Sequence, residues 1–474
     1  MPMRSDPCTD EEASAVYALA TGGGLADQSG ANNRTFFTVP PGRVEPVVPR
    51  IPKGAFGAYD VPANPSGIEP MLLSPLEIWR AVSRRSPYVP NLLYTHRDPD
   101  FMIVAGVVDD AGNPAPTLGS LDPARNPALR ARLTVDMPRI FGSFDGMVRG
   151  DFADGRPPLV TPRDDVAAFL DKRNEWISKQ TKWWEDPDIG VLCEAFGVER
   201  DLVAPEGRRE TGFAPTDFGY AHVSLHEGNV LVPPDQTWAI DIDRGVWAPP
   251  GFNMAAHLRS VVYQYEPDEV AAMWDNYGNE LDRETRAAMA VNYPRIKDAE
   301  VSRECAAYVW DVARMSRWSR EGRPVSQEHW NLRMMQLHGS VNNVNAYVTG
   351  APRREYGELA EIAEYAARSG VQALRPRHTG VRRQLVAVPV EVPAEAANPA
   401  VSSAKVVRTR VGGTIVNTSA ILPFARPIPH GLRPVSAIPG ARPLSDLPAQ
   451  HDRPATGYQT AAKAALEKTL ACEP

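Results

Sequence analysis

Residues 221–243, which read AHVSLHEGNVLVPPDQTWAIDID, decide the fold of this chain. Two short apolar runs lie in this stretch, at 230–232 and 238–240, and the residues between them begin Pro-Pro-Asp. Proline and aspartate favour tight turns, because proline fixes its own backbone angle and aspartate bonds to nearby backbone groups. Two apolar runs joined by such a turn predict a β-hairpin.

Asn229 and Asp241 fall at the ends of the two expected strands, where neighbouring side chains can meet. An amide oxygen and a carboxylate are ligands that a hard cation such as Mg²⁺ accepts. Phosphoryl transfer uses such a pair to hold Mg²⁺ on the phosphates. The pattern therefore predicts that these two residues form a metal site.

The same stretch resembles the catalytic segment of aminoglycoside phosphotransferase-like kinases, usually H-G-D-L-H-P-G-N-V-L followed by I-D-W-E. The resemblance implies an α+β fold of the bilobal protein kinase-like type, with a small β-rich N-lobe and a mainly helical C-lobe. It also implies ATP and Mg²⁺ as cofactors, with Asn229 and Asp241 as the metal ligands. The positions that match in register are His222, Leu225, His226, Gly228, Asn229, Val230, Leu231, Ile240 and Asp241.

The chain departs from the family pattern at Ser224, which stands where the family has its catalytic aspartate. A hydroxyl cannot act as a general base near neutral pH as a carboxylate does, and such assistance is typically worth ~10²–10⁴-fold in rate. A later segment, 247–258, resembles the family's G-D-P-x-Y-D-L-A-x-H-L, but Pro249 and Asn253 occupy its two acidic positions. Both departures point to weakened activity.

Three interpretations follow. The first is an ATP-dependent phosphotransferase acting on an alcohol group of a small hydroxylated acceptor, with Ser224, His222, Asn229 and Asp241 at the catalytic centre. The second is a pseudokinase, a catalytically inactive binding or regulatory subunit that still binds nucleotide. The third treats His222 and His226 as a metal pair, but no third ligand follows at a sensible spacing.

Ser29, Gly30 and Asn32 lie in a loop that is followed by an aromatic and β-branched run. Small and amide residues in this place predict a turn between two strands, whose backbone N–H groups can face phosphate oxygens. The family carries a similar loop, which the resemblance assigns to nucleotide binding. The alternative is an ordinary polar hairpin.

Arg50 lies in the apolar, proline-rich run 46–52, which by resemblance presents a cation to the nucleotide phosphates; Lys53 is the fallback. Each proline removes a ladder donor, so we expect this strand to be irregular or at a sheet edge. A helix capped by Ser74 should carry Glu77, which the resemblance pairs with Arg50. The alternatives are a solvated arginine and an ordinary acidic residue at a helix N-terminus.

Residues 89–107 read as a strand, a turn and a second strand, and the resemblance places the adenine-binding hinge at Ala105 and Val107. From 108 to 158 the chain is rich in Asp, Gly and Pro, and we treat it as irregular, either an insertion or substrate-side structure. Apolar residues at helical spacing predict the remaining elements. Helices are expected at 161–184, 189–197, 266–282, 297–320, 326–348 and 355–369.

Composition sets the compartment and the partners. The 474 residues are 43% hydrophobic with a net charge of −7, which suits a soluble globular protein and gives no sign of nucleic-acid binding. We find no apolar run long enough to span a bilayer and no signal peptide. The four cysteines are far apart, as in a reduced cytoplasmic protein.

The expected domains are an N-terminal helix and extension (1–20), an N-lobe (21–106), a C-lobe containing the catalytic hairpin 222–243 (107–372) and a tail (373–474). From 374 onward, 13 Lys and Arg face 6 Asp and Glu, and prolines are frequent. Such a basic, proline-rich tail is expected to be largely disordered. It can dock on the acidic body or bind an acidic protein partner.

Overall fold

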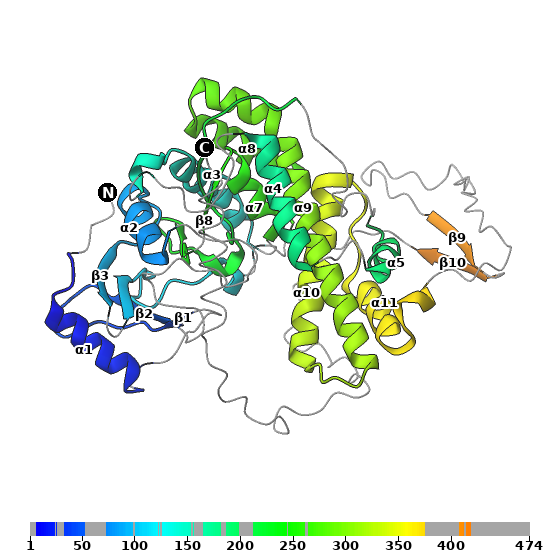
Figure 1. Cartoon of the computed structure of the whole chain (residues 1–474), viewed down its shortest axis with the longest axis horizontal. Coiled ribbons are helices and arrows are strands. Elements are labelled where there is room, and N and C mark those ends of the chain that lie inside the picture. Colours follow the sequence, from blue (N-terminus) through cyan, green and yellow to red (C-terminus); the bar gives the residue numbers. More distant parts are fainter. Residues whose placement is uncertain are drawn as a thin grey trace, which may run out of the picture. The chain divides into compact units, whose positions relative to one another are not determined.

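The chain divides into two units, one formed by Met1–Leu374 with Ala437–Pro474 and the other by Arg375–Ser436 (Figure 1). In the second unit, β9 (Val407–Val411) and β10 (Thr414–Thr418) form an antiparallel hairpin; the other calls on the tail lie outside the described residues. The computed structural model describes residues 6–23, 25, 33–52, 73–97, 100–121, 123, 126–152, 155, 165–181, 186–198, 212–243, 245–260, 264–374, 407–411 and 414–418.

An antiparallel sheet of four strands forms the β-rich part of the first unit. Its strands lie in the order β1-β2-β4-β3, and the pair β3–β4 is the strand, turn and strand expected at 89–107. The α+β class predicted from the sequence is therefore confirmed. The bounds are β1 (Asn33–Thr35), β2 (Val47–Pro52), β3 (Leu92–Arg97) and β4 (Asp100–Ala105).

Strand β2 is an inner strand in continuous register with both neighbours, and the prediction that its prolines would make it irregular or place it at an edge is wrong. It pairs with β1 on one side and with β4 on the other. In an antiparallel strand the N–H and C=O of one residue point to the same neighbour. The Pro49 carbonyl accepts a hydrogen bond from Phe36 N, 3.2 Å away and just beyond the end of β1. The missing N–H of Pro49 therefore faces the side where β1 has ended, and the ladder with β4 is spared.

The two faces of this sheet pack against different helices. Alternate residues of β4 point to opposite faces. Phe101 and Ile103 pack with apolar residues of α1, whereas Met102 and Val104 share a core with α2. The two helices are α1 (Asp10–Thr21) and α2 (Pro75–Arg85).

Both helices begin with the signals read from the sequence. Thr9 caps α1 and exchanges hydrogen bonds with Glu12. Ser74 caps α2 in the same reciprocal way with Glu77. Each such capping box satisfies two backbone N–H groups that a helix start otherwise leaves unpaired.

Helix α3 (Pro127–Asp145) occupies part of 108–158, and the prediction of irregular structure there is wrong. Its buried apolar residues recur every three or four positions, which places them on one face of a helix. Pro138 lies inside the helix and obscured that periodicity. The buried apolar side chains of α3 are Leu129, Leu133, Met137, Pro138, Ile140, Phe141 and Phe144.

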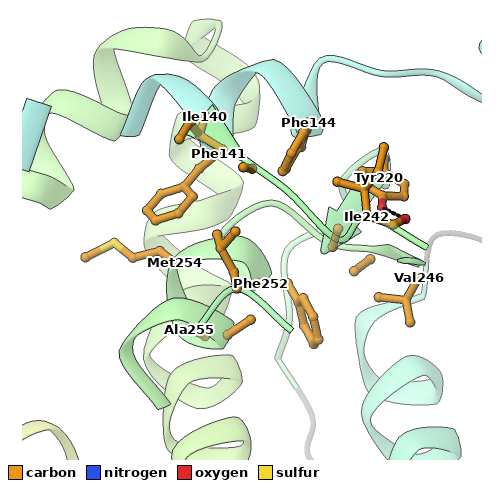
Figure 2. Close-up of a cluster of buried hydrophobic side chains, with 14 of the residues drawn as sticks. Ile140, Phe141, Phe144, Tyr220, Ile242, Val246, Phe252, Met254 and Ala255 are labelled. Carbon is orange, nitrogen blue, oxygen red and sulfur yellow. Dashed lines mark hydrogen bonds between the residues drawn. The ribbon is translucent and has the colours of Figure 1, made fainter. Parts of the chain in front are cut away.

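Two short pairs of strands lie beside α3. The expected hairpin is present, with β6 (Val230–Leu231) antiparallel to β7 (Trp238–Ala239). A second pair joins β5 (Gly219–His222) to β8 (Gly245–Ala248). Figure 2 shows how α3, β5, β8 and helix α7 meet around one apolar core, to which the labelled residues Ile140, Phe141, Phe144, Tyr220, Ile242, Val246, Phe252, Met254 and Ala255 contribute.

Further helices follow in the described part of the first unit. The one expected at 297–320 begins earlier, at Arg283, because Asp282 caps it and the helix continues through Pro294. A second apolar core joins α5, α9, α10 and α11. The bounds are α4 (Val166–Thr181), α5 (Pro187–Phe196), α7 (Phe252–Ser260), α8 (Pro267–Glu280), α9 (Arg283–Arg320), α10 (Gln327–Val344) and α11 (Tyr356–Ser369).

Within the described ranges, no helix has the length and apolarity needed to cross a membrane. Cys8, Cys193 and Cys305 are buried free thiols. Their reduced state agrees with the sequence-based expectation for these three positions.

A buried ionic cluster joins α4, α7 and α9. The Glu300 side chain is fully buried and accepts hydrogen bonds from three guanidinium groups, those of Arg173, Arg259 and Arg303. Burial works to raise the pKa of Glu300, but the three arginines outweigh it and hold the pKa far below its usual value. The carboxylate is thus the common counterion of three buried cations.

We expect Glu300→Gln to lower the free energy of unfolding by about 3–5 kcal/mol, because removing one partner leaves buried charges without this counterion. Urea denaturation followed by circular dichroism measures the change. Glu284→Gln, at an exposed position of the same helix, is the matched control and should change stability by no more than about 0.5 kcal/mol. A loss below about 1 kcal/mol at Glu300 would contradict the role given to this carboxylate.

Candidate functional site

The turn after β5, residues 222–225, is held by side chains of α7. His222 N donates to Asn253 Oδ1 at 3.0 Å, and His257 Nδ1 lies 3.0 Å from Leu225 O. Residues 253 and 257 are four apart, so they lie on one face of the helix. Arg259, at the end of α7, donates to Val223 O. The backbone of the turn is therefore fixed along its length by one helix.

Asn229 is attached to this turn and to the hairpin. Its side-chain Nδ2 donates to Ser224 O at 2.8 Å, and its backbone carbonyl accepts from Ile240 N at 2.9 Å. Because a side-chain amide has one donor group and one acceptor oxygen, this arrangement leaves Oδ1 as the atom for a ligand. Ile240 directly precedes Asp241, so the structure brings together the two residues predicted as metal ligands.

Asp241 has a backbone φ of 58°, the only positive value found for a non-glycine residue in the described ranges. The left-handed region is unfavourable for most L-residues, although aspartate tolerates it better than most. Such backbone strain tends to persist where surrounding contacts hold it, often at functional sites. It marks Asp241 independently of the sequence motif.

Arg50 lies between two carboxylates. Its Nη2 is 2.5 Å from Asp241 Oδ1 and 2.9 Å from Asp243 Oδ2. Asp243 also accepts from Asn33 Nδ2 at 2.9 Å and from Trp79 Nε1 at 2.5 Å. The side chain of Asp241 is 41% exposed and that of Asp243 only 10%. Asp241 can therefore reach a ligand, whereas Asp243 fixes Arg50 from behind.

The two carboxylates differ in their pKa values. Burial works to raise the pKa of Asp241, but opposing interactions, of which the charge of Arg50 is the largest, leave the pKa below its usual value. Burial raises the pKa of Asp243; Arg50 opposes this shift and the charge of Asp241 adds to it. Asp241 is thus the carboxylate that stays ionised, as a metal ligand must.

The sequence reading missed Asp243 and Trp79. Asp243 was visible as the second acidic residue of I-D-I-D, two positions after Asp241. Trp79 gave no such signal, because an apolar residue on the buried face of α2 reads as core. Its ring also lies 5.2 Å from the Arg50 guanidinium, within the range of a cation–π contact.

Glu77 caps its own helix in this structure. Its Oε2 accepts from Ser74 N at 2.8 Å and from Ser74 Oγ at 3.0 Å. Trp79, two positions later in α2, also lies close to Arg50. An approach of Glu77 to Arg50 in a nucleotide-bound state remains a prediction.

The His222 ring braces the turn that contains Ser224. Its Nδ1 accepts from Ser224 N at 3.2 Å, so the ring proton belongs on Nε2, which lies 3.0 Å from Ile240 O. Both ring nitrogens are therefore engaged with the backbone. His226 Nδ1 accepts from Gly228 N at 3.0 Å. This arrangement does not favour the reading of the two histidines as a metal pair.

Across the part of the chain that is described, no group of three or more His, Cys, Asp or Glu side chains is arranged to hold a metal. The predicted pair, Asn229 and Asp241, would supply two ligands. Mg²⁺ fits such a pair, because it usually keeps several waters and binds through one or two carboxylates plus substrate phosphates.

The expected hinge residues are Ala105, the last residue of β4, and Val107, just after it. Ala105 N donates to Asn91 O at 2.8 Å, and Val107 O accepts from Ala115 N at 2.9 Å. The expected phosphate-loop residues Ser29, Gly30 and Asn32 lie outside the described residues, as does Lys53. Adenine and phosphate binding at these positions remain predictions.

Asn253 connects the turn to a buried carboxylate. Its Nδ2 donates to Asp145 Oδ1 at 2.9 Å, and Tyr277 donates its hydroxyl proton to Asp145 as well. Burial raises the pKa of Asp145 to about 7, although these two hydrogen bonds oppose the shift. Burial also lowers the pKa of His257 to about 4. Two groups beside the turn therefore titrate far from their usual pH.

Comparison with known proteins gives similarities of fold only. No family model matches the chain, and no curated protein matches it. A choline/ethanolamine kinase family protein from Mesorhizobium loti is 12% identical with a TM-score of 0.38, covering 77% of this chain and 98% of its own. An amicoumacin kinase in complex with AMP-PNP, Ca²⁺ and Ami is 12% identical with a TM-score of 0.43, covering 74% and 97%. A thermostable mutant of an aminoglycoside phosphotransferase, in its apo form, is 13% identical with a TM-score of 0.38, covering 71% and 98%. At these TM-scores, none of the similarities decides family or activity.

The two shifted groups give a testable pH dependence. A raised pKa at Asp145 contributes stability that is present below about pH 4 and is lost as the pH rises towards 7. A lowered pKa at His257 acts in the opposite sense, because its contribution is lost as the pH falls from about 6.5 to 4. The two contributions oppose each other across this window.

We therefore expect Asp145→Asn to make the free energy of unfolding rise more steeply with pH than in the wild type. The free energy of unfolding of the wild type, minus that of the variant, should fall by up to about 1.4 kcal/mol per pH unit between pH 4.5 and 7. Urea denaturation at four pH values in this range measures it. Parallel curves for the two proteins would show that Asp145 does not titrate here.

Proposed function

We propose that this chain binds a nucleoside triphosphate with Mg²⁺ and is a weakened phosphotransferase of the kinase-like, bilobal type, transferring to a hydroxyl group of a small molecule. The lobes would be residues 21–106 and 107–372. The observation that supports this most is Asp241, which has a left-handed backbone, is paired with Arg50 and follows Ile240, whose N–H donates to the Asn229 backbone carbonyl. A basic side chain and two oxygen ligands at one turn suit a metal–phosphate group.

Each residue then has a role that its contacts support. Asn229 Oδ1 and Asp241 would hold the metal, which when bound neutralises charge on the phosphates. Arg50 presents a planar guanidinium suited to bidentate contact with phosphate. Asp243, fixed by Asn33 and Trp79, keeps Arg50 in place.

The weak point of the proposed reaction is the general base. Ser224 offers only a hydroxyl, and both ring nitrogens of His222 are engaged with backbone groups. Neither is arranged to take a proton from an acceptor. Because phosphoryl transfer has a loose transition state and depends mainly on positioning and charge, slow transfer is still compatible with this site.

A second candidate function is nucleotide-dependent binding without catalysis. The backbone of residues 222–229 is held by hydrogen bonds from the side chains of Asn229, Asn253 and His257, whatever side chain stands at position 224. A site can therefore keep its shape for a nucleotide after losing its base. The tail would then be a candidate contact for an acidic protein partner.

Binding of AMP-PNP with and without Mg²⁺, measured by calorimetry, tests the metal site. We expect Mg²⁺ to tighten binding in the wild type, and Asp241→Ala to remove that difference, because the ionised metal ligand is lost. Asn229→Ala should weaken Mg²⁺-dependent binding by about tenfold or more. Asp235→Ala, at an exposed position in the hairpin turn, is the control and should bind as the wild type does. Unchanged Mg²⁺-dependent binding in Asp241→Ala would refute the assignment.

Ser224→Asp tests whether the chain is an enzyme that lost its base. If the acceptor pocket is intact, the new carboxylate should raise ATP turnover by about 10²–10⁴-fold over the wild type. A panel of hydroxylated small molecules, with water as the default acceptor, provides the assay, and Ser224→Ala is the matched control. No gain in the presence of normal nucleotide binding would favour the binding subunit. Wild-type turnover of ~1–100 s⁻¹ would show that another group acts as base.

A further inference from the structure

A carboxylate that is linked to the turn 222–225 through Asn253 comes from a distant part of the sequence. Asn253 Nδ2 donates to Asp145 Oδ1 at 2.9 Å, so the last residue of α3 meets the first turn of α7. Gly219 permits this approach, because a Cβ there would lie 2.5 Å from Asp145 O. β5 and the end of α3 are thus held in close backbone contact beside the turn.

The polarity of these hydrogen bonds requires an amide at 253 and a carboxylate at 145. His222 N can only donate, so the Asn253 oxygen must accept. Tyr220 O can only accept, and it lies 3.1 Å from Asn253 Nδ2. The same Nδ2 donates to Asp145, whose other oxygen accepts from the Tyr277 hydroxyl. A carboxylate at 253 would satisfy neither Tyr220 nor Asp145.

A continuous series of hydrogen bonds runs from this carboxylate to the candidate metal ligand. It passes from Asp145 to Asn253, then to His222 N, and from His222 Nδ1 to Ser224 N. Ser224 O then accepts from Asn229 Nδ2. In the links to the turn, a backbone group fixes the direction of each hydrogen bond, because a backbone N–H can only donate and a backbone C=O can only accept.

We propose that Asp145 is a positioning residue which, through Asn253, sets the turn 222–225 and thereby the orientation of Asn229 Oδ1 in the nucleotide–metal site. The inference rests on the proposed function, since it concerns the same site. Asp145 is a carboxylate on α3 that acts on the turn through an amide on α7. It does not touch the ligand itself.

An exchange of the two side chains tests the proposal. Asp145→Asn replaces an acceptor that takes two hydrogen bonds, and Asn253→Asp places two carboxylates face to face. The double variant Asp145→Asn with Asn253→Asp restores a complementary pair with reversed polarity: the new carboxylate accepts from His222 N and from the new amide. Residues that act through one another are non-additive, so a double-mutant cycle detects the coupling.

Two readouts are measured on the full chain. One is amide hydrogen exchange of residues 219–229, which reports the turn without any ligand. The other is the Kd for AMP-PNP with Mg²⁺. We expect each single variant to lose protection in this segment and to bind about tenfold more weakly, as for loss of one charge-assisted hydrogen bond. The double variant should bind more tightly and exchange more slowly than either single variant, but recovery should be partial, because Tyr220 O then has no donor at position 253.

Matched controls separate positioning from general destabilisation. Asp136→Asn removes another carboxylate of α3, one that accepts from Thr237 instead of Asn253, and should leave exchange at 219–229 unchanged. If a single variant fails to fold, Tyr277→Phe removes one hydrogen bond to Asp145 while keeping the ring, and it should give a smaller effect of the same kind.

The outcomes separate this inference from the proposed function. Single variants that lower the unfolding free energy but leave Kd and the exchange of 219–229 unchanged would overturn the positioning role, as would a double variant no better than the singles. Absence of nucleotide binding in the wild type would refute the proposed function alone. In that case recovery of exchange protection in the double variant would still support positioning of the turn by Asp145, and failure to recover would overturn it.

Discussion

The hydrogen bonds from α7 to the turn 222–225 are the constraint on which the candidate site depends. Asn253 and His257 each hold one backbone group of the turn. They are four residues apart, so they lie on one face of the helix. Arg259 holds a third, at Val223. A four-residue turn has too few internal bonds to keep one conformation, so it needs such external partners. Asn229 is bonded to this turn at Ser224 O, so its position depends on the same three side chains of α7.

Electrostatic interactions make the second constraint, and the balance of charge differs between two places in the site. After β7, Arg50 is shared by Asp241 and Asp243, so two negative charges face one positive charge. At the turn 222–225, Arg259 belongs to the buried cluster around Glu300. Buried charges of this kind add little net stability, but removing one partner is costly. The arrangement therefore favours a defined geometry at the turn over stability.

Some of this organisation could be predicted from the sequence. The hairpin at 230–239, the capping boxes of α1 and α2, and the pairing of β3 with β4 all follow from local signals. α3 was missed because an internal proline masks its periodicity, and β2 was misplaced because its prolines were read as edge markers. In both cases the proline is tolerated by a tertiary arrangement that a local reading does not contain.

The sequence by itself determined the chemistry available at the site: an amide at 229, a carboxylate at 241, a cation at 50 and a hydroxyl at 224. These depend on residue type and short spacing, which local propensity can read. Only the tertiary structure decided how they are connected. It paired Arg50 with Asp243 as well as Asp241, and it joined Asn253 to Asp145 across 108 positions of sequence. Such contacts depend on how helices and strands pack in space, and no spacing within one segment encodes which distant side chain will supply the partner.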